Sequence, residues 1–206
     1  MGHRNDSRLE IFEAGERLQM HKGTNMRANS LKLGLLLCLV AQAAVCAEPA
    51  PRDGQHDFDF NIGMWNVHIE SLHRPASGPD SWNKFDGTAV VRKVWDGRAQ
   101  LEEIEADGAA GHLEAMVLFL YDPQSNQWSK AFAAGGDGQL GPPMFGEFKD
   151  RRGEFYDQES LHGKVALLRA VWSNITPDSQ DFEESSSDDG GRTWQPYFVA
   201  KFVRSR

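Results

Sequence analysis

Four polar residues on two adjoining segments have the types and spacing to hold or act on a small molecule. Arg169 lies in the middle of an apolar alternating segment, where a buried and unpaired charge would be unfavourable. Asp157 and Glu159 in the preceding segment could pair with it, and Tyr156 lies beside them. An inward Arg169 paired in this way could hold a ligand carboxylate or take part in acid–base chemistry. The alternative is an Arg169 that lies along the outer surface with its charge in water.

Two further groups of carboxylates admit two interpretations. The simpler one is that they form the solvated outer face of a sheet. The functional one is that one or two of them point into an enclosed space and share it with a cation. The first group is Glu102, Glu103 and Glu105, and the second is Asp181, Glu183 and Glu184.

Neither a metal ion nor a cofactor is expected. No two histidines after the first fifty residues stand at a spacing typical of a metal site. The ten-stranded haem barrels of the nitrobindin family use a histidine close to the C-terminus, whereas the segment from Thr193 onward contains none. Each histidine is therefore interpreted as a surface or hydrogen-bonded residue. They are His56, His68, His73, His112 and His162.

The segments that must position these side chains are short β-strands. From His56 onward there is no helical stripe of useful length, but there are many alternating runs bounded by Gly, Pro, Asp and Asn. Short turns between consecutive strands favour antiparallel neighbours and an up-and-down barrel of about ten strands, with a β-sandwich as the alternative. After a first strand around 65–69, the predicted strands are 85–95, 99–106, 113–121, 128–133, 144–149, 154–160, 164–174, 181–186 and 193–203.

Trp65 predicts how such a barrel would be closed. The first and last strands of a closed barrel meet, so a cation in the last strand can cover an indole in the first. Arg204 and Lys201 are the candidates for that cation, and Gly63 would allow the chain a tight approach. We expect Trp65 to fill one end of the barrel, which leaves the other end for a ligand.

A second structural motif lies in the last hairpin. Ser187, Asp189, Gly191 and Trp194 match the pattern Ser-x-Asp-x-Gly-x-Thr-Trp, in which the Asp carboxylate accepts backbone N–H groups while the Trp packs beneath. Sialidase propellers repeat this motif in several blades. One copy predicts a turn and not a glycosidase.

The N-terminal residues predict export. An apolar run over 33–45 follows a short cationic stretch and ends in small residues, which is typical of a cleaved signal peptide over 26–47 rather than of a membrane span. Residues 1–25 are polar and do not fit such a leader, so we interpret them as a non-native extension from an upstream start. The sequence predicts a periplasmic or secreted protein with no membrane span in its mature form.

The mature chain would consist of a linker (48–55) and one barrel domain (56–206). Cleavage after Ala47 removes both Cys38 and Cys46, so neither a disulfide nor a thiolate metal site would remain. It leaves 16 basic and 26 acidic residues, a net charge of −10. This acidic balance argues against nucleic acid as a partner.

The strand predicted over 113–121 is apolar on both faces from Met116 onward, unlike a strand with one solvated face. A neighbouring segment or a second subunit would cover such a wall. A homodimer through this strand is the resulting hypothesis.

Several motifs resemble an uncharacterised family of mostly bacterial, often secreted proteins that is regarded as lipocalin-like, of the calycin type. The resemblance implies a lipocalin-like barrel over most of 56–205 and carries no catalytic residue with it. It rests on residues 56–65, 85–87, 120–123, 146–148, 172–177 and 187–194.

Three classes of function remain, in order of preference. The first is a barrel that binds a small apolar or amphipathic molecule, favoured by the aromatic content and by the lack of a nucleophile or metal constellation. The second is an enzyme, such as a cyclase, isomerase or hydrolase, with polar residues in the lumen. The third is an interaction protein whose barrel is filled. A binding protein is favoured over an enzyme.

Overall fold

The computed structural model describes residues 53–205 except 162–163. The expected extension (1–25), the expected signal peptide (26–47) and most of the expected linker (48–55) lie outside the described residues and stay predictions. Residues 53–55, also expected in the linker, pack against the barrel. The backbone oxygen of Gly54 accepts a hydrogen bond of 3.0 Å from Nε1 of Trp128.

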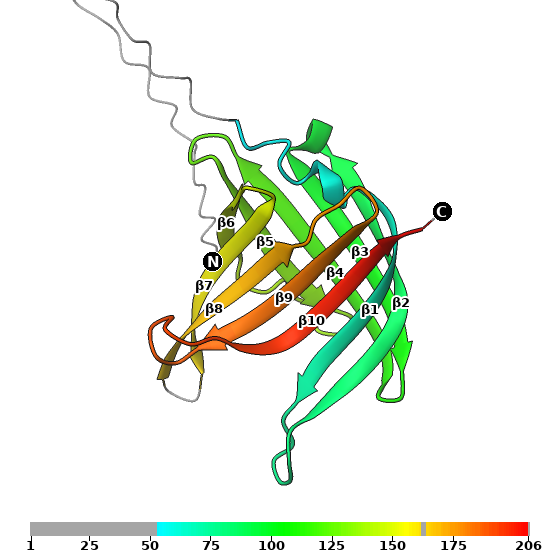
Figure 1. The fold of residues 1–206 in the computed structure, drawn as a ribbon, viewed down its shortest axis with the longest axis vertical. Coiled ribbons are helices and arrows are strands. Elements are labelled where there is room, and N and C mark those ends of the chain that lie inside the picture. The colour runs from blue at the N-terminus through cyan, green and yellow to red at the C-terminus, as the bar shows by residue number, and fades with distance from the viewer. Residues whose placement is uncertain (1–52, 162–163, 206) are drawn as a thin grey trace, which may run out of the picture. The chain divides into compact units, whose positions relative to one another are not determined.

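Ten strands form one closed antiparallel barrel (Figure 1). Each strand pairs with its neighbours along the chain, and the first pairs with the last. The predicted up-and-down barrel is confirmed, and the sandwich alternative is excluded. The strands are β1 (Gly63–His73), β2 (Ser81–Val94), β3 (Ala99–Gly108), β4 (Gly111–Asp122), β5 (Gln127–Ala134), β6 (Met144–Lys149), β7 (Arg152–Leu161), β8 (Lys164–Ser173), β9 (Ser179–Ser187) and β10 (Gln195–Arg204), with 3-10 helices η1 (Asp59–Asn61) and η2 (Trp95–Gly97).

Alternation along each strand decides which side chains enter the barrel. Successive residues of a strand point to opposite faces of the sheet. Along β3, Glu102, Ile104 and Ala106 are buried, whereas Glu103 and Glu105 are exposed. The pairing registers extend this assignment around the barrel, since residues that pair across two strands share a face.

Helix η1 closes one end of the barrel, at the top of Figure 1, together with an aromatic cluster. Phe58, just before η1, is fully buried at the centre of this cluster. Its ring centroid lies 4.5 Å from that of Phe119, 5.0 Å from Phe148 and 5.1 Å from Trp172. Large inward rings from several strands therefore pack this end solid.

Trp65 belongs to the same closed end. It is fully buried, and its Nε1 donates a hydrogen bond of 2.8 Å to the backbone oxygen of Asn61. The cation over its ring is Arg204, at 4.0 Å from the ring centroid, whereas Lys201 is exposed on the outer face of β10. Gly63 has a φ of 132°, and a Cβ there would lie 2.4 Å from Nη1 of Arg204.

Gly153, which follows the β6–β7 turn, has a role in core packing. The β6–β7 turn takes its positive φ angles from Asp150 (50°) and Arg151 (61°) and not from Gly153. Gly153 lies within β7, where a Cβ would be 2.5 Å from Cε1 of Phe148. Its missing side chain makes room for this ring, so its importance is in core packing.

The β9–β10 connection has the geometry that its motif predicts. Asp189 Oδ1 accepts the backbone N–H of Thr193 at 3.0 Å, and Ser187 Oγ accepts that of Gly191 at 2.8 Å. The hydrogen bonds from Thr193 and Ser187 lower the pKa of Asp189 to about 2. Trp194 lies on the outside of the barrel, 6.2 Å from the ring of Tyr156.

The outer surface bears on two expectations about partners. Met116 on the outer face of β4 is 39% exposed, and the homodimer through this wall stays a prediction. Among the residues that the structure describes, no helix combines the length and apolar character needed to cross a bilayer.

Candidate functional site

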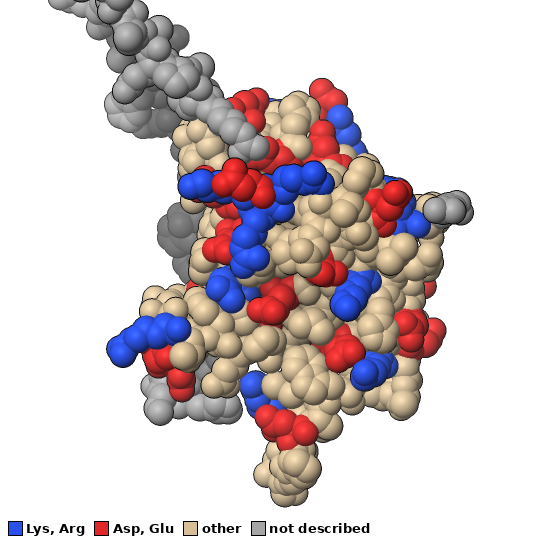
Figure 2. Space-filling view, in the orientation of Figure 1, with Lys and Arg blue, Asp and Glu red and all other residues tan. Residues whose placement is uncertain are grey.

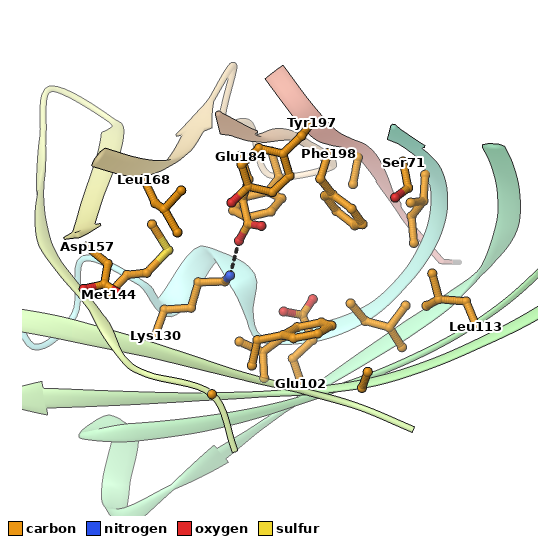
Figure 3. Close-up of a pocket in the computed structure, with 18 of the residues that line it drawn as sticks. Ser71, Glu102, Leu113, Lys130, Met144, Asp157, Leu168, Glu184, Tyr197 and Phe198 are labelled. Atoms are coloured by element: carbon orange, nitrogen blue, oxygen red, sulfur yellow. Dashed lines mark hydrogen bonds and ion pairs between the residues drawn. The ribbon is translucent and has the colours of Figure 1, made fainter. Parts of the chain in front are cut away.

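The half of the barrel away from η1 contains a cavity of about 470 Å³ (Figure 3). Its mouth lies among the strand ends and the 135–143 segment opposite η1, where Leu72, Leu113, Gly141 and Pro142 line it. Phe132 points inward there and is still 42% exposed. The cavity is thus a pocket with one packed end and one end at the surface.

The sizes of the inward side chains explain why only one half is hollow. Inward positions around the cavity include Ala134, Ala200 and Val117. Inward positions at the closed end carry rings such as Phe119 and Phe148. Rings fill the closed end, whereas the small inward residues at the other end leave space between the rings that also line it.

An ion pair crosses the cavity. Lys130 of β5 points inward, is 6% exposed and hydrogen-bonds the carboxylate of Glu184 of β9 (Figure 3). The Lys130 Nζ also lies 5.3 Å from the ring centroid of Phe182. Since buried charges require partners, this pair is the polar centre of the site.

Glu102 is a second carboxylate inside the cavity. It is 5% exposed, and its register partners are the buried Val91 and Val117. Its Oε1 has no hydrogen-bond partner among the described residues. Burial raises the pKa of Glu102 to about 7, against the opposing effect of the Lys130 charge.

A bulge brings two neighbouring aromatic residues into the cavity. The β9–β10 register shifts between Pro196 and Phe198, so that Tyr197 and Phe198 both line the cavity. Tyr197 hydrogen-bonds the Glu184 carboxylate. Burial, reinforced by the negative charge of Glu184, raises the pKa of Tyr197. The phenol therefore stays protonated and donates a hydrogen bond to the Glu184 carboxylate.

Two of the four predicted ligand-binding residues, Asp157 and Glu159 of β7, line the cavity. The other two, Tyr156 and Arg169, lie on the outer wall, where they pair across β7 and β8. The guanidinium carbon of Arg169 lies 4.3 Å from the ring centroid of Trp194. The structure therefore divides the predicted group between the two sides of the wall.

The expectation of an inward Arg169 is corrected for a reason visible in β8. The inward interpretation treats the face that Arg169 shares with Val165 and Val171 as the inner one because it is apolar, and the structure supports the alternative on the outer surface. Val165 is 61% exposed, whereas the alternate residues Leu168 and Ala170 are the buried, inward ones. Both faces of β8 are apolar, so hydrophobicity did not identify the inner one.

The outer wall differs from the cavity in charge pattern. Figure 2 shows Lys and Arg interspersed with Asp and Glu over β7 to β10, without a large patch of one sign. Arg169 Nη2 lies 3.8 Å from Oε1 of Glu183, and the Tyr156 hydroxyl donates to Glu154 at 2.6 Å. These neighbouring groups partner one another.

Lys130, like Tyr197, is a site residue that the sequence analysis did not identify. It alternates with Trp128 and Phe132, and this alternation places all three on one face of the strand. A cation between two aromatic positions of one face was the available signal. Glu102 and Glu184 were considered, but only as members of groups whose solvated interpretation was preferred.

The described part of the chain contains no cluster of three or more His, Cys, Asp or Glu residues that could hold a metal ion. The arrangement can instead present a carboxylate, an ion pair and a phenol inside an apolar space. Such a site can orient the polar group of an otherwise apolar molecule.

Comparison of the sequence with known proteins does not identify a family. No protein-family profile matches the sequence, and no curated protein matches it. The family resemblance noted in the sequence therefore stays an expectation, while the barrel itself is observed.

Some solved barrels have a similar overall shape. The S-type phycobiliprotein lyase CPES from Guillardia theta is 10% identical, with a TM-score of 0.48 over 76% of this chain and 99% of that one. A de novo designed fluorescence-activating β-barrel is 12% identical, with a TM-score of 0.38 over 75% of this chain and 100% of that one. A redesigned barrel bound to DFHBI is 7% identical, with a TM-score of 0.40 over 70% and 99%. Scores this low carry no conclusion about the function of this chain.

Proposed function

We propose that this protein binds one small, largely apolar molecule inside the barrel. The observation that carries the proposal is the cavity of about 470 Å³ inside the barrel, beside the packed end formed by the aromatic cluster. Small-molecule sites measure roughly 300–1,000 Å³ and are mostly apolar with a few polar groups. This cavity matches that description in both size and lining.

The other two classes of function have less support. The enzyme interpretation relied on Arg169 and Tyr156 acting with Asp157 and Glu159, and these pairs lie on opposite sides of the barrel wall. A barrel filled by its own side chains would leave no such cavity. Binding requires neither a nucleophile nor a cofactor, so the residues present are sufficient for it.

The test is a titration with N-phenyl-1-naphthylamine, a neutral probe whose fluorescence rises in apolar surroundings. We expect saturable binding of one probe per chain. Ala134→Trp places an indole in the mouth and should weaken binding about tenfold or more, which corresponds to about 1.4 kcal/mol. Ala133→Trp is the matched control, because Ala133 is the preceding residue of β5 and points outward.

Two results would overturn the proposal. One is the absence of saturable probe binding by the folded protein. The other is equal binding by the wild type and the Ala134→Trp variant. Circular dichroism and thermal melting of both tryptophan variants would show that the barrel remains folded.

We also propose that the protein functions outside the cytoplasm. The support is the leader pattern over 26–47, an apolar run that follows cationic residues and ends in small ones. Expression of the full chain in a bacterium, followed by fractionation and N-terminal sequencing, tests this. A mature chain that begins at Glu48 in the periplasm is expected, and an uncleaved cytoplasmic product would contradict it.

A further inference from the structure

We propose that the ligand carries a cationic head, such as a protonated amine, and that Glu102 binds this head inside the barrel. This inference rests on the proposed function, since it requires a ligand in the lumen. It names the class of ligand as a cationic amphiphile. The argument depends on the burial of Glu102, the pairing of Lys130 and the charges of the lining.

Glu102 is a carboxylate without a sufficient partner. It lies between Val91 and Val117 on the neighbouring strands, and its Oε1 accepts no hydrogen bond from any described residue. Burial of an unpaired carboxylate is strongly unfavourable. In Figure 3 the Glu102 side chain extends toward the cavity, so that a donor on a bound molecule can reach it.

The lining cation is already occupied. Among the described residues that line the cavity, Lys130 alone carries a full positive charge, and it is hydrogen-bonded to Glu184. A ligand carboxylate would have to compete with Glu184 for this ammonium. It would also lie close to Glu102, and the two negative charges would repel each other. A fatty-acid-like head is therefore disfavoured.

The complete set of lining charges has the sign that attracts a cation. Five carboxylates and one ammonium line the cavity, a formal excess of four negative charges. Four of these carboxylates point inward, whereas Glu114 pairs with the outward Glu105 and reaches the mouth from the outer face. A charged cavity with apolar walls concentrates counter-ions of the opposite sign. The carboxylates are Glu102, Glu114, Asp157, Glu159 and Glu184, and Glu114 lies near the strand end at the mouth.

The rest of the cavity suits an apolar body. Ile69, Ile104, Leu168, Phe198 and Phe202 line it beside the charged groups. An ammonium at Glu102 would leave the attached chain or ring among these residues. The Lys130–Glu184 ion pair and the neutral Tyr197 would then lie on one side of the ammonium.

The experiment compares three dodecyl compounds as competitors of N-phenyl-1-naphthylamine at pH 8. Dodecylammonium, dodecanol and dodecanoate share one apolar chain and differ in the charge of the head. Each is used below its micelle concentration. Dodecylammonium should displace the probe at about tenfold to hundredfold lower concentration than dodecanol, as one charge-assisted hydrogen bond implies. Dodecanoate should be the weakest competitor.

Two substitutions on β3 distinguish an effect of the Glu102 charge from an effect of the protein's overall negative charge. Glu102→Gln removes the inward charge with little change of shape and should abolish most of the preference for dodecylammonium over dodecanol. Glu105→Gln removes an outward charge from the same strand and should leave the preference unchanged. Retained binding of the neutral probe shows that each variant is folded.

The possible outcomes are distinct. Equal competition by dodecylammonium and dodecanol, a stronger dodecanoate, or a preference that survives Glu102→Gln would overturn this inference while leaving small-molecule binding intact. Failure of the wild type to bind the neutral probe or any of the three compounds would overturn the proposed function itself. The wild-type comparison decides the charge preference even if Glu102→Gln does not fold.

Discussion

The two ends of the barrel bury polar groups in different ways. At the closed end they are neutral amides: Gln180 Nε2 donates to Asn61 Oδ1 at 2.7 Å, and Gln100 Nε2 donates to the backbone oxygen of Phe58 at 3.0 Å. At the hollow end they are charged, as in Lys130 and Glu102. Both ends therefore contain buried polar side chains, and in the described part of the chain the buried charged residues, Lys130 and Glu102, lie at the hollow end.

This difference indicates which end of the barrel stabilises the fold and which end is suited to binding. A buried neutral amide with one hydrogen bond is a modest penalty, whereas a buried carboxylate without a donor is a large one. The rings of Phe119 and Phe148 belong to the packed core of this end, whose burial outweighs that penalty. Among the described residues no donor hydrogen-bonds Oε1 of Glu102, and the nearby charge of Lys130 offsets its burial only in part. We interpret the closed end as the stabilising half and the hollow end as the half whose instability serves binding.

The largest effect is expected at the closed end, from Trp65→Ala. Loss of the fully buried indole leaves a cavity under Arg204 and should lower the free energy of unfolding by about 3–5 kcal/mol. Chemical denaturation measures this. An unfolding free energy within about 1 kcal/mol of wild type would show that this end is not the stabilising half.

Arg204→Met tests the cover of the same end. Its guanidinium donates to the backbone oxygens of Phe60 at 2.9 Å, Ile62 at 3.0 Å and Pro177 at 2.7 Å. Loss of these charge-assisted bonds should lower the unfolding free energy by about 2–3 kcal/mol. Lys201→Met is the control on the same strand, and its effect should stay within about 0.5 kcal/mol because Lys201 is exposed. Equal effects of the two variants would contradict a specific role of Arg204.

Glu102→Gln should have the opposite sign. The pKa of Glu102 is about 7 in the folded state against 4.5 in the unfolded state, so the folded state holds this proton more tightly. The stability of the wild type should therefore fall as the pH rises from 4.5 through 7. The groups that share the cavity with Glu102 are Lys130, Glu184, Tyr197, Glu114, Asp157 and Glu159.

The variant lacks this titration and should be more stable than wild type at pH 8, by about 1–2 kcal/mol, because an amide is less unfavourable to bury than a carboxylate. The advantage should vanish near pH 4. Thermal melting across this range measures it. A destabilised variant at pH 8 would mean that Glu102 has a favourable partner within the folded chain.

The smallest effect is expected on the outer wall, from Arg169→Gln. This side chain stacks on Trp194 and lies near Glu183 at the surface, so its loss should lower stability by less than about 1 kcal/mol. Affinity for the neutral probe should remain within about twofold, a change of about 0.4 kcal/mol. A large loss of affinity would restore Arg169 to the binding site.

The sequence predicted the fold well because strand alternation and turns are local signals. The ten strands and the meeting of Trp65 with the last strand followed from patterns within one or two segments. Boundaries were less accurate where pairing decides them. β2 begins at Ser81 and not at Phe85, because its first four residues pair with the end of β1.

The site was only partly predictable, since the inner face of a barrel strand depends on the register with its neighbours. Asp157 and Glu159 were placed correctly at the cavity, but Arg169 was not, because both faces of β8 are apolar. Lys130 and Glu184 are far apart in sequence, and their pairing across the lumen exists only in the closed barrel. No local sequence pattern indicates which side chains will meet across the lumen.

The most direct test of the account is a crystal structure of the protein with dodecylamine at pH 8. The account predicts one molecule in the cavity, its chain among Ile104, Leu168 and Phe198 and its nitrogen about 2.7–2.9 Å from a carboxylate oxygen of Glu102, as charge-assisted bonds require. An empty cavity at saturating ligand, or a nitrogen that turns away from Glu102 toward the solvent, would contradict it.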